Sequence, residues 1–283
     1  MIEILKTGFY DSIQDLGRCG FQHLGVPISG AMDVSSAKLA NALLNNDEND
    51  AVLEFTIKGP KLKFHKDVLI SITGAESSPK INGIGFQLHR PQILKANDVL
   101  SFGQFGLGCR GYLAVMGGFQ TEQVLGSRSM CSGITKEARL TKGDHLPVLN
   151  QLPQTIKRTA KVKGNLNPSL VEVVEVSKGI EFEKLSLNSQ NQIFQRTFTV
   201  ASISNRMAYQ CKENASNTLE PIITSLVLPG TVQLTPSGQL MILMRDCQTT
   251  GGYPRILQLT EKGINRLSQR KTGETFRFSC ILE

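Results

Sequence analysis

Three stretches of the sequence concentrate hydrogen-bonding side chains beside glycines, a composition that suits loops holding a small polar ligand. They are QDLGRCG with GVPISGAMD within residues 14–33, SNRMAY at residues 204–209, and DCQTTGGYPR at residues 246–255. The first two contain Arg18 and Arg206, and an arginine can bind a carboxylate or a phosphate through two parallel hydrogen bonds. The chemistry that these residues suggest is the binding of an anionic group.

In the stretch 246–255, two adjacent glycines follow two threonines between apolar, β-prone flanks. Glycine lets the backbone approach a ligand closely, and the hydroxyls of Thr249 and Thr250 add donors next to exposed backbone N–H groups. Tyr253 precedes a proline and is therefore expected to be extended. The plainer interpretation is a β-turn in which Asp246 and the threonines bond the local backbone, and composition alone favours it.

The stretch 14–33 places Gln14, Asp15 and Arg18 within five residues. Asp15 could hold Arg18 in place, so an internal ion pair is the alternative to a ligand site. Ser29 and Gly30 lie just before a predicted helix, whose N-terminus would favour an anion, but Asp33 could simply cap that helix. In the stretch 204–209, Asn205 and Arg206 are donors, and a surface strand end is the alternative interpretation.

Several other chemistries are not supported by any motif. The sequence has no GxxxxGK[ST] phosphate loop and no GxSxG nucleophile elbow. GQFGLG at residues 103–108 lacks the dinucleotide-binding spacing. The four histidines share no metal-ligand spacing, so we predict no metal site, and no biotin-attachment lysine motif is present.

The elements that must position these residues are mainly β-strands with a few helices. Short apolar runs separated by turn residues, among them FQLHR at residues 86–90 and TFTVASIS at residues 197–204, predict strands through most of the chain. We predict helices after Asp33, over residues 183–195 and over residues 261–269. The division that fits best is two β-barrel-like domains, at residues 1–155 and 156–283.

Composition limits the class of protein further. The net charge of +7 is scattered, and its densest run, IKRTAKVKG at residues 156–164, lacks the aromatic residues of a nucleic-acid stacking surface. We therefore expect no nucleic-acid partner. The six cysteines form no CxxC pair, the N-terminus has no signal-peptide pattern, and no apolar run is long enough for a membrane helix. These features predict reduced thiols, no membrane partner and a cytoplasmic location.

Taken together, the three stretches resemble the family of the 5-oxoprolinase C component, also called KipA, which is related to the carboxyltransferase part of urea carboxylase. The matching segments are QDLGRCGFQHLGVPISGAMD, SNRMAY and PGTVQLTPSGQLMILMRDCQTTGGYPRI, with RGYLAVMGGF and VLGSRS between them. The resemblance implies two cyclophilin-like β-barrel domains. It also implies an assembly with a KipI-like (PxpB-like) B component and a PxpA-like A component that converts 5-oxo-L-proline to L-glutamate with ATP and magnesium.

The resemblance also implies which residues form the pocket for a small amide substrate. The expected catalytic residues are Asp246, Arg18, Arg206 and Thr249. Around them, the residues expected to bind substrate are Gln14, Asp15, Ser29, Gly30, Asp33, Asn205, Tyr209, Gln233, Gln248, Thr250, Gly252 and Tyr253. The two arginines would clamp a carboxylate or phosphate, Asp246 would act as a base or magnesium ligand, and the threonines would bond the amide.

Two alternatives remain open beside this expectation. The first is a biotin-dependent carboxyltransferase acting on a small amide such as urea, with the biotin carried on another chain. The second is a regulatory module that binds a KipI-type kinase inhibitor. The sequence departs from the family pattern at Ala208, Thr224 and Leu226, next to the expected pocket.

Overall fold

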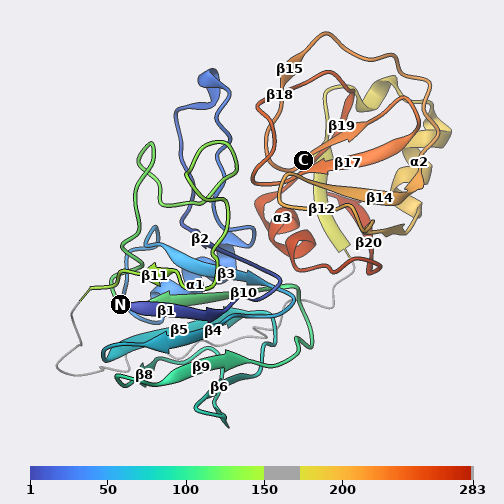
Figure 1. The fold of residues 1–283 in the computed structure, drawn as a ribbon. Helices are drawn as coiled ribbons and strands as arrows, with labels where there is room; N and C mark the ends of the chain where they lie inside the picture. The colour runs from blue at the N-terminus through green and yellow to red at the C-terminus, as the bar shows by residue number, and fades with distance from the viewer. Residues whose placement is uncertain (150–172, 282–283) are drawn as a thin grey trace. The chain divides into compact units, whose positions relative to one another are not determined.

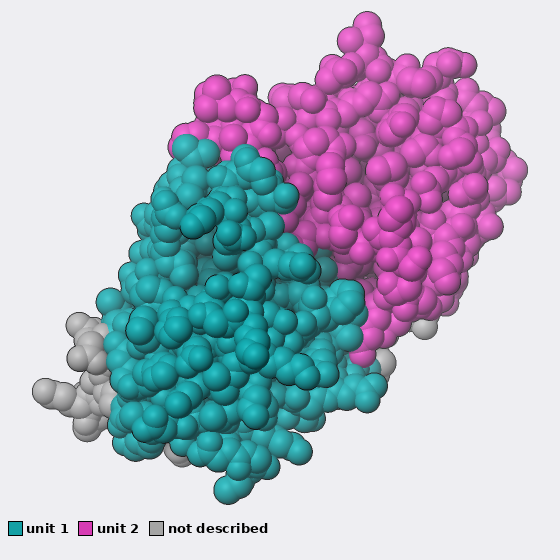
Figure 2. Space-filling view, viewed as in Figure 1, with its two compact units in different colours: residues 1–18, 29–168 teal, residues 19–28, 169–283 magenta. Residues whose placement is uncertain are grey.

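The computed structural model describes residues 1–149 and 173–281, and the chain divides into two compact units (Figures 1 and 2). Unit 1 contains residues 1–18 and 29–168, and unit 2 contains residues 19–28 and 169–283. The short segment 19–28 therefore belongs to the second unit, although its neighbours in sequence belong to the first. The predicted domain boundary near residue 155 and the basic run 156–164 lie outside the described residues.

Unit 1 is built from two antiparallel sheets. One has the strand order β11-β1-β4-β9-β6-β7 and the other has the order β2-β3-β10-β5-β8. The strands of the first sheet are β1 (Ile2–Lys6), β4 (Lys61–Phe64), β6 (Pro79–Ile81), β7 (Ile84–Gly85), β9 (Val99–Phe102) and β11 (His145–Leu146). Those of the second are β2 (Tyr10–Gln14), β3 (Val52–Thr56), β5 (Val68–Gly74), β8 (Gln92–Leu94) and β10 (Arg110–Val115).

The five-stranded sheet is covered on both faces, which explains why its central strands are buried at every position. Along β3, Leu53 and Phe55 join the core shared with the other sheet, whereas Val52 packs with the residues of helix α1 (Val34–Ala42). Successive side chains of a strand point to opposite faces, so both faces need apolar cover. Hydroxyls of the sheet also reach the helix, because Ser71 Oγ donates to the Ala40 carbonyl at 2.6 Å.

Unit 2 is a seven-stranded sheet that nearly closes on itself. Its order is β13-β20-β12-β19-β16-β17-β14, and an antiparallel bridge between Val200 and Cys211 joins the two edges. Closing a sheet in this way removes exposed edges. The strands are β12 (Val173–Lys178), β13 (Phe198–Thr199), β14 (Ala208–Asn214), β16 (Thr231–Leu234), β17 (Gln239–Leu243), β19 (Arg255–Leu259) and β20 (Thr275–Cys280).

Helices and a small extra sheet complete unit 2. Helix α2 (Leu187–Gln195) is capped by Ser186, and helix α3 (Glu261–Ser268) is capped by Thr260, which accepts from the Gly263 N–H at 3.0 Å. The two-stranded sheet pairs β15 (Ser225–Leu226) with β18 (Thr250–Gly251). Single 3₁₀ turns lie at Gln22–Leu24 and Phe182–Lys184.

The predicted mainly-β fold with a few helices is confirmed, and the described residues contain three α-helices close to the predicted positions. The predicted strand over residues 86–90 is wrong. His89 has φ of 59° and its N–H donates to the Ile72 carbonyl, so the chain turns there and strand β8 begins only at Gln92. Of the strand predicted over residues 197–204, only Phe198–Thr199 forms.

All six cysteines are free thiols. Among the described residues, no helix combines the length and the apolar character that crossing a membrane requires.

Candidate functional site

The first predicted stretch begins where strand β2 ends, and its centre is a buried carboxylate. Asp15 Oδ1 accepts hydrogen bonds from the hydroxyls of Ser127 and Ser129, both at 2.6 Å, and from the Gly17 N–H at 2.8 Å. Asp15 Oδ2 accepts from the Arg128 N–H at 2.6 Å. Four donors around one carboxylate stabilise its charge in a buried position. Asp15 therefore fixes the loop 127–129 against the segment 15–17.

Arg18 is buried to 1% exposure, and most of its donors have no partner among the residues that the structure describes. Its Nη2 donates to the Ser129 carbonyl, whereas Nε and Nη1 have no hydrogen-bond partner in the described part of the chain. The predicted alternative of an Asp15–Arg18 ion pair is wrong, since the donors to Asp15 are two serines and two backbone N–H groups. A buried guanidinium with unpaired N–H groups is costly unless a ligand satisfies them.

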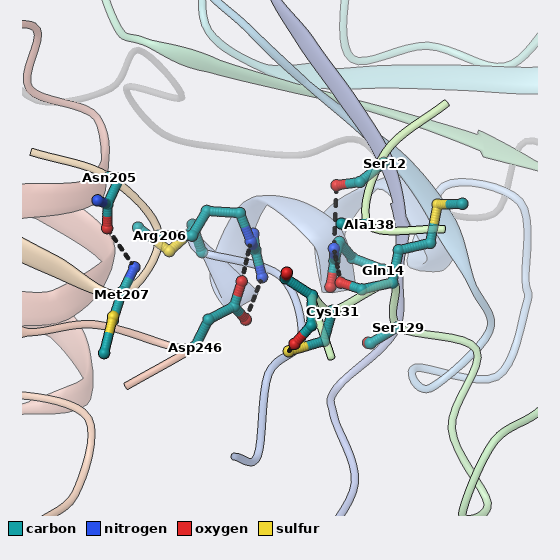
Figure 3. A network of polar contacts seen from close by, with 12 residues as sticks. Ser12, Gln14, Ser129, Cys131, Ala138, Asn205, Arg206, Met207 and Asp246 are labelled. Atoms are coloured by element: carbon teal, nitrogen blue, oxygen red, sulfur yellow. Dashed lines mark hydrogen bonds and ion pairs between the residues drawn. The ribbon is translucent and has the colours of Figure 1, made fainter. Parts of the chain in front are cut away.

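Gln14 and Ser29 add two further unsatisfied polar groups to the same part of unit 1. The Gln14 amide donates to Ser12 Oγ at 2.9 Å and to the Met130 carbonyl at 3.1 Å, but its Oε1 has no partner among the residues described (Figure 3). Ser29 Oγ is likewise buried without a partner within residues 1–149 and 173–281. Three buried groups therefore have hydrogen-bonding atoms without partners among the described residues: the Gln14 amide oxygen, the Arg18 guanidinium and the Ser29 hydroxyl.

Gly30 brings the segment 29–31 against the segment 15–17. The Ala31 N–H donates to the Asp15 carbonyl at 2.9 Å, and Gly30 has φ of 91°. A Cβ atom at residue 30 would lie 2.9 Å from the Gly17 nitrogen, so a side chain does not fit there. Glycine is required at this position both for its backbone conformation and for the close approach.

Asp33 performs the capping role that the sequence offered as an alternative. Its Oδ1 accepts from the Ser36 N–H at 3.1 Å, which occupies the N-terminus of α1 with the chain's own carboxylate. Its backbone N–H donates to the Tyr112 hydroxyl, which in turn donates to Glu54 Oε2 at 2.9 Å. Burial raises the pKa of Tyr112 well above its usual value, so this hydroxyl stays a donor.

The second and third predicted stretches meet in unit 2. Buried Arg206 and half-buried Asp246 form a two-bond ion pair, with Nε to Oδ2 at 2.8 Å and Nη2 to Oδ1 at 3.0 Å (Figure 3). The Asp246 N–H also donates to the Arg206 carbonyl at 3.0 Å. The pair holds the turn before β14 against the turn after β17.

Asn205 and Tyr209 have structural partners in this unit. Asn205 Oδ1 accepts from the backbone N–H groups of Met207 and Ala208, at 2.8 and 3.2 Å, which is a local turn (Figure 3). Tyr209 is buried, and its hydroxyl lies 3.5 Å from the carbonyls of Ser268 and Arg270 at the end of α3. The methyl of Ala208 packs with Val227, Leu243 and Cys247, so this departure from the family pattern is accommodated in a small apolar cluster.

The rest of the third stretch lies around a buried amide. Gln233 on β16 is 1% exposed, and its Nε2 has no partner within the described ranges. A Cβ atom at Gly251 would lie 2.4 Å from that Nε2, so the glycine of β18 leaves room for the amide. The half-buried and exposed residues beside it are Gln248, Thr249, Thr250, Gly252 and Tyr253.

The predicted residues thus form two groups. The structure brings Gln14, Asp15, Arg18, Ser29 and Gly30 together in unit 1. In unit 2 it pairs Arg206 with Asp246, and it places Gln233 of β16 against Gly251 of β18. The convergence of both groups on one pocket stays a prediction. Residue-by-residue reasoning missed Ser127, Arg128 and Ser129, whose only signal was the family-like VLGSRS segment.

Asp15 and Asp246, two of the predicted acids of the site, have hydrogen-bond donors on both carboxylate oxygens. Both oxygens of Asp15 accept from serines and backbone N–H groups, and both oxygens of Asp246 accept from Arg206. These carboxylates position protein segments, and we assign no magnesium to them. What the two groups offer a ligand is the set of unpaired polar atoms on Arg18, Gln14, Ser29 and Gln233.

The chain is similar to a known protein family and to a bacterial 5-oxoprolinase component. Over residues 24–280 the chain matches the family described as carboxyltransferase domain, subdomain A and B. It is 31% identical to the 5-oxoprolinase C component of Escherichia coli, over 100% of this chain and 92% of that protein.

Urea-processing proteins match the chain as well. The chain is 38% identical to the urea amidolyase of Lachancea kluyveri over 99% of its own length, but it spans only 17% of that protein. The crystal structure of the K. lactis urea amidolyase superimposes with a TM-score of 0.88 at 26% identity, covering 99% of this chain and 19% of that one. The match is therefore to one part of these longer proteins.

Proposed function

The chain belongs to the carboxyltransferase family of subdomains A and B, and from this premise we propose that it is the C component of an ATP-dependent 5-oxoprolinase. In this proposal it binds 5-oxo-L-proline and acts only together with its A and B components. The overall reaction opens the lactam to L-glutamate and hydrolyses one ATP to ADP and phosphate.

The observation that carries the proposal is the unsatisfied guanidinium of Arg18. Its two partnerless donors are buried, so an anionic ligand gains the most by entering the site. 5-Oxo-L-proline carries a carboxylate, whereas urea is neutral. This difference favours the oxoprolinase over a urea-directed activity.

The other unpaired atoms suit the remainder of the substrate. The lactam has one N–H donor and one carbonyl acceptor. Gln14 Oε1 is a buried acceptor for the former, and Ser29 Oγ is a hydroxyl able to donate to the latter. Asp15 acts as a positioning residue, because three of its four hydrogen bonds hold the loop that supplies the Ser129 carbonyl to Arg18.

The chemical problem is the low reactivity of the ring amide. Transfer of the γ-phosphoryl group of ATP to the lactam oxygen forms an O–P bond and releases ADP. Water then attacks the former carbonyl carbon, the C–N bond breaks and the ring nitrogen takes up a proton, which leaves an acyl phosphate. A second water hydrolyses the acyl phosphate to the side-chain carboxylate of glutamate and releases phosphate. The contribution of this chain is to orient the lactam and to stabilise its charge.

The test combines the purified chain with its A and B components and measures glutamate and ADP. We expect ADP formation that depends on 5-oxo-L-proline. Arg18→Ala should lower kcat/KM for 5-oxo-L-proline by about 30-fold to 900-fold, because one buried charged hydrogen-bond donor contributes roughly 2–4 kcal/mol. Arg18→Lys should recover part of that loss.

The matched control is Arg90→Ala, since Arg90 is an exposed arginine of the same unit. It should leave the kinetics unchanged. Wild-type kinetics in Arg18→Ala would rule out the assigned role of Arg18, and no glutamate from the complete wild-type mixture would rule out the function itself.

A second candidate function is carboxyl transfer from biotin to a small amide such as urea. The 38% identity to a urea amidolyase, higher than the identity to the bacterial oxoprolinase component, favours it. Biotin would then ride on another chain and supply the carboxyl group. Carboxylation of urea by carboxybiotin, without any response to 5-oxo-L-proline, would identify this activity.

A further inference from the structure

Three potential metal ligands share the outer face of the six-stranded sheet in unit 1. Strand β1 lies between β11 and β4, and Glu3 is in register with His145 on one side and with Lys63 on the other. Ile2 and Ile4 on either side of Glu3 are fully buried, so Glu3 points away from the core. The third ligand, His65, directly follows β4, and its N–H donates to the Met1 carbonyl.

The side chains of these residues converge. Glu3 Oε2 lies 2.9 Å from His65 Nε2, and the imidazole rings of His65 and His145 are inclined by 22° with centroids 6.2 Å apart. One ligand atom from each of the three residues lies within 4.8 Å of the others. A tetrahedral zinc ion needs its ligand atoms roughly 3.3–3.5 Å apart, given bond lengths of about 2.0–2.2 Å. The side chains are partly exposed, so small rotations can close that gap.

We propose that Glu3, His65 and His145 form a site for a divalent transition metal, with zinc as the ion that suits it best. Two imidazoles and one carboxylate are ligands that zinc accepts, and three protein ligands leave a fourth position for water. Lys63 faces Glu3 from β4, and its charge opposes a cation there. The affinity therefore belongs to the micromolar range and not to that of a permanent structural zinc.

Such an ion would join parts of the chain that are far apart in sequence. The pairing of β1 with β11 spans two residue pairs, Ile2 with Leu146 and Glu3 with His145, and backbone hydrogen bonds of Ile4 to Gly143 and Asp144 extend it. A metal bound across them and His65 would clamp the first strand to the last strand of the sheet. An ion that binds only the folded state raises stability by mass action.

The experiment is calorimetric titration of the full chain with zinc chloride, in a Cys19→Ser background that removes the exposed thiol. We expect one zinc per chain, a higher Tm with zinc, and visible absorption bands of tetrahedral cobalt when Co²⁺ replaces zinc. His65→Ala and His145→Ala should each weaken zinc binding by at least tenfold. Lys63→Gln should strengthen it several-fold, because it removes the opposing charge.

His23→Ala is the matched control, since it removes an exposed histidine that lies elsewhere. It should bind zinc like the parent protein. No binding below millimolar zinc would overturn the proposal, and so would equal binding by the parent and by the His65 and His145 variants. Thiolate-to-cobalt charge transfer in the near ultraviolet would assign the ion to cysteine and overturn it as well.

Discussion

Two buried aspartates at strand β2 show how differently this protein treats a carboxylate. Asp15 receives four hydrogen bonds. Asp11 receives one backbone hydrogen bond, from the Gly8 N–H at 2.5 Å, and its Oδ1 has no partner in the described part of the molecule. Burial of the carboxyl group, which the hydrogen bond from Gly8 offsets only in part, raises the pKa of Asp11 to about 7.

This raised pKa predicts a loss of stability with rising pH. The folded state binds the Asp11 proton more tightly than the unfolded state, whose aspartate has a pKa of about 3.9. The stabilising contribution is complete below about pH 4 and is lost as pH rises through 7. Asp11→Asn should remove that dependence and should raise the free energy of unfolding at pH 8 by roughly 1–3 kcal/mol.

Urea unfolding at pH 4.5, 6 and 8 measures this effect. Asp67→Asn provides a control of opposite sign, because a hydrogen bond from Lys95 lowers the pKa of Asp67. That variant should be slightly less stable than the parent at pH 8. Parallel pH profiles for Asp11→Asn and the parent would show that Asp11 is ionised in the folded protein.

The role of Asp15 also shows what single residues reveal in sequence. The pattern Gln14, Asp15, Arg18 identified the buried polar segment, and the structure places all three in unit 1. The partners of Asp15 could not be read from the sequence, because Ser127 and Ser129 are 112 and 114 residues away. The spacing in the sequence suggested Arg18 as the partner of Asp15, whereas in the folded protein the hydroxyls of Ser127 and Ser129 bind it.

At the scale of elements, the close approach of the segments 15–17 and 29–31 leads to a stability prediction. Gly30→Ala places a Cβ atom 2.9 Å from backbone atoms at a φ of 91°. We expect a loss of about 2–4 kcal/mol, of which about 1–2 is backbone strain and the rest is the steric clash.

Gly143→Ala separates these two contributions. Gly143 has the same φ of 91°, but nothing lies within 4 Å of the position of its Cβ. Its variant should therefore show the strain alone. If chemical denaturation gave equal losses for the two variants, the close packing beneath Gly30 would not be significant.

Strands and helices were predicted well where a local apolar pattern defines them. They were predicted less well where they depend on pairing with a distant part of the chain. The short apolar runs that contain residues 52–56 and 68–74 predict strands β3 and β5, and Asp33 predicts the start of α1. The turn at His89 depends on a hydrogen bond to Ile72 in a different strand. The Glu3, His65 and His145 cluster depends on the register of β1 with β11, which no sequence spacing encodes.

At the scale of the whole molecule, the segment 19–28 is the feature with the clearest consequence for stability. It belongs to unit 2, but it is carried by the N-terminal part of the chain. A fragment of residues 169–283 therefore lacks one piece of its own unit. We expect that fragment to have a lower Tm alone than when it is mixed with a fragment of residues 1–168.

The control is a 1–168 fragment in which a Gly-Ser linker of equal length replaces residues 19–28. It should bind the 169–283 fragment more weakly, as measured by size-exclusion chromatography and thermal unfolding. Identical unfolding of residues 169–283 with and without either partner would mean that the segment contributes nothing to unit 2.

The crossing of residues 19–28 also limits how this protein can evolve. The chain passes from unit 1 to unit 2, returns, and passes over again after residue 168. One recombination break between genes can therefore not transplant either half intact, since each product would inherit a fragment of the other. An exchange of one unit alone needs breaks at all three crossings, whereas a fusion that carries the whole chain needs none of them.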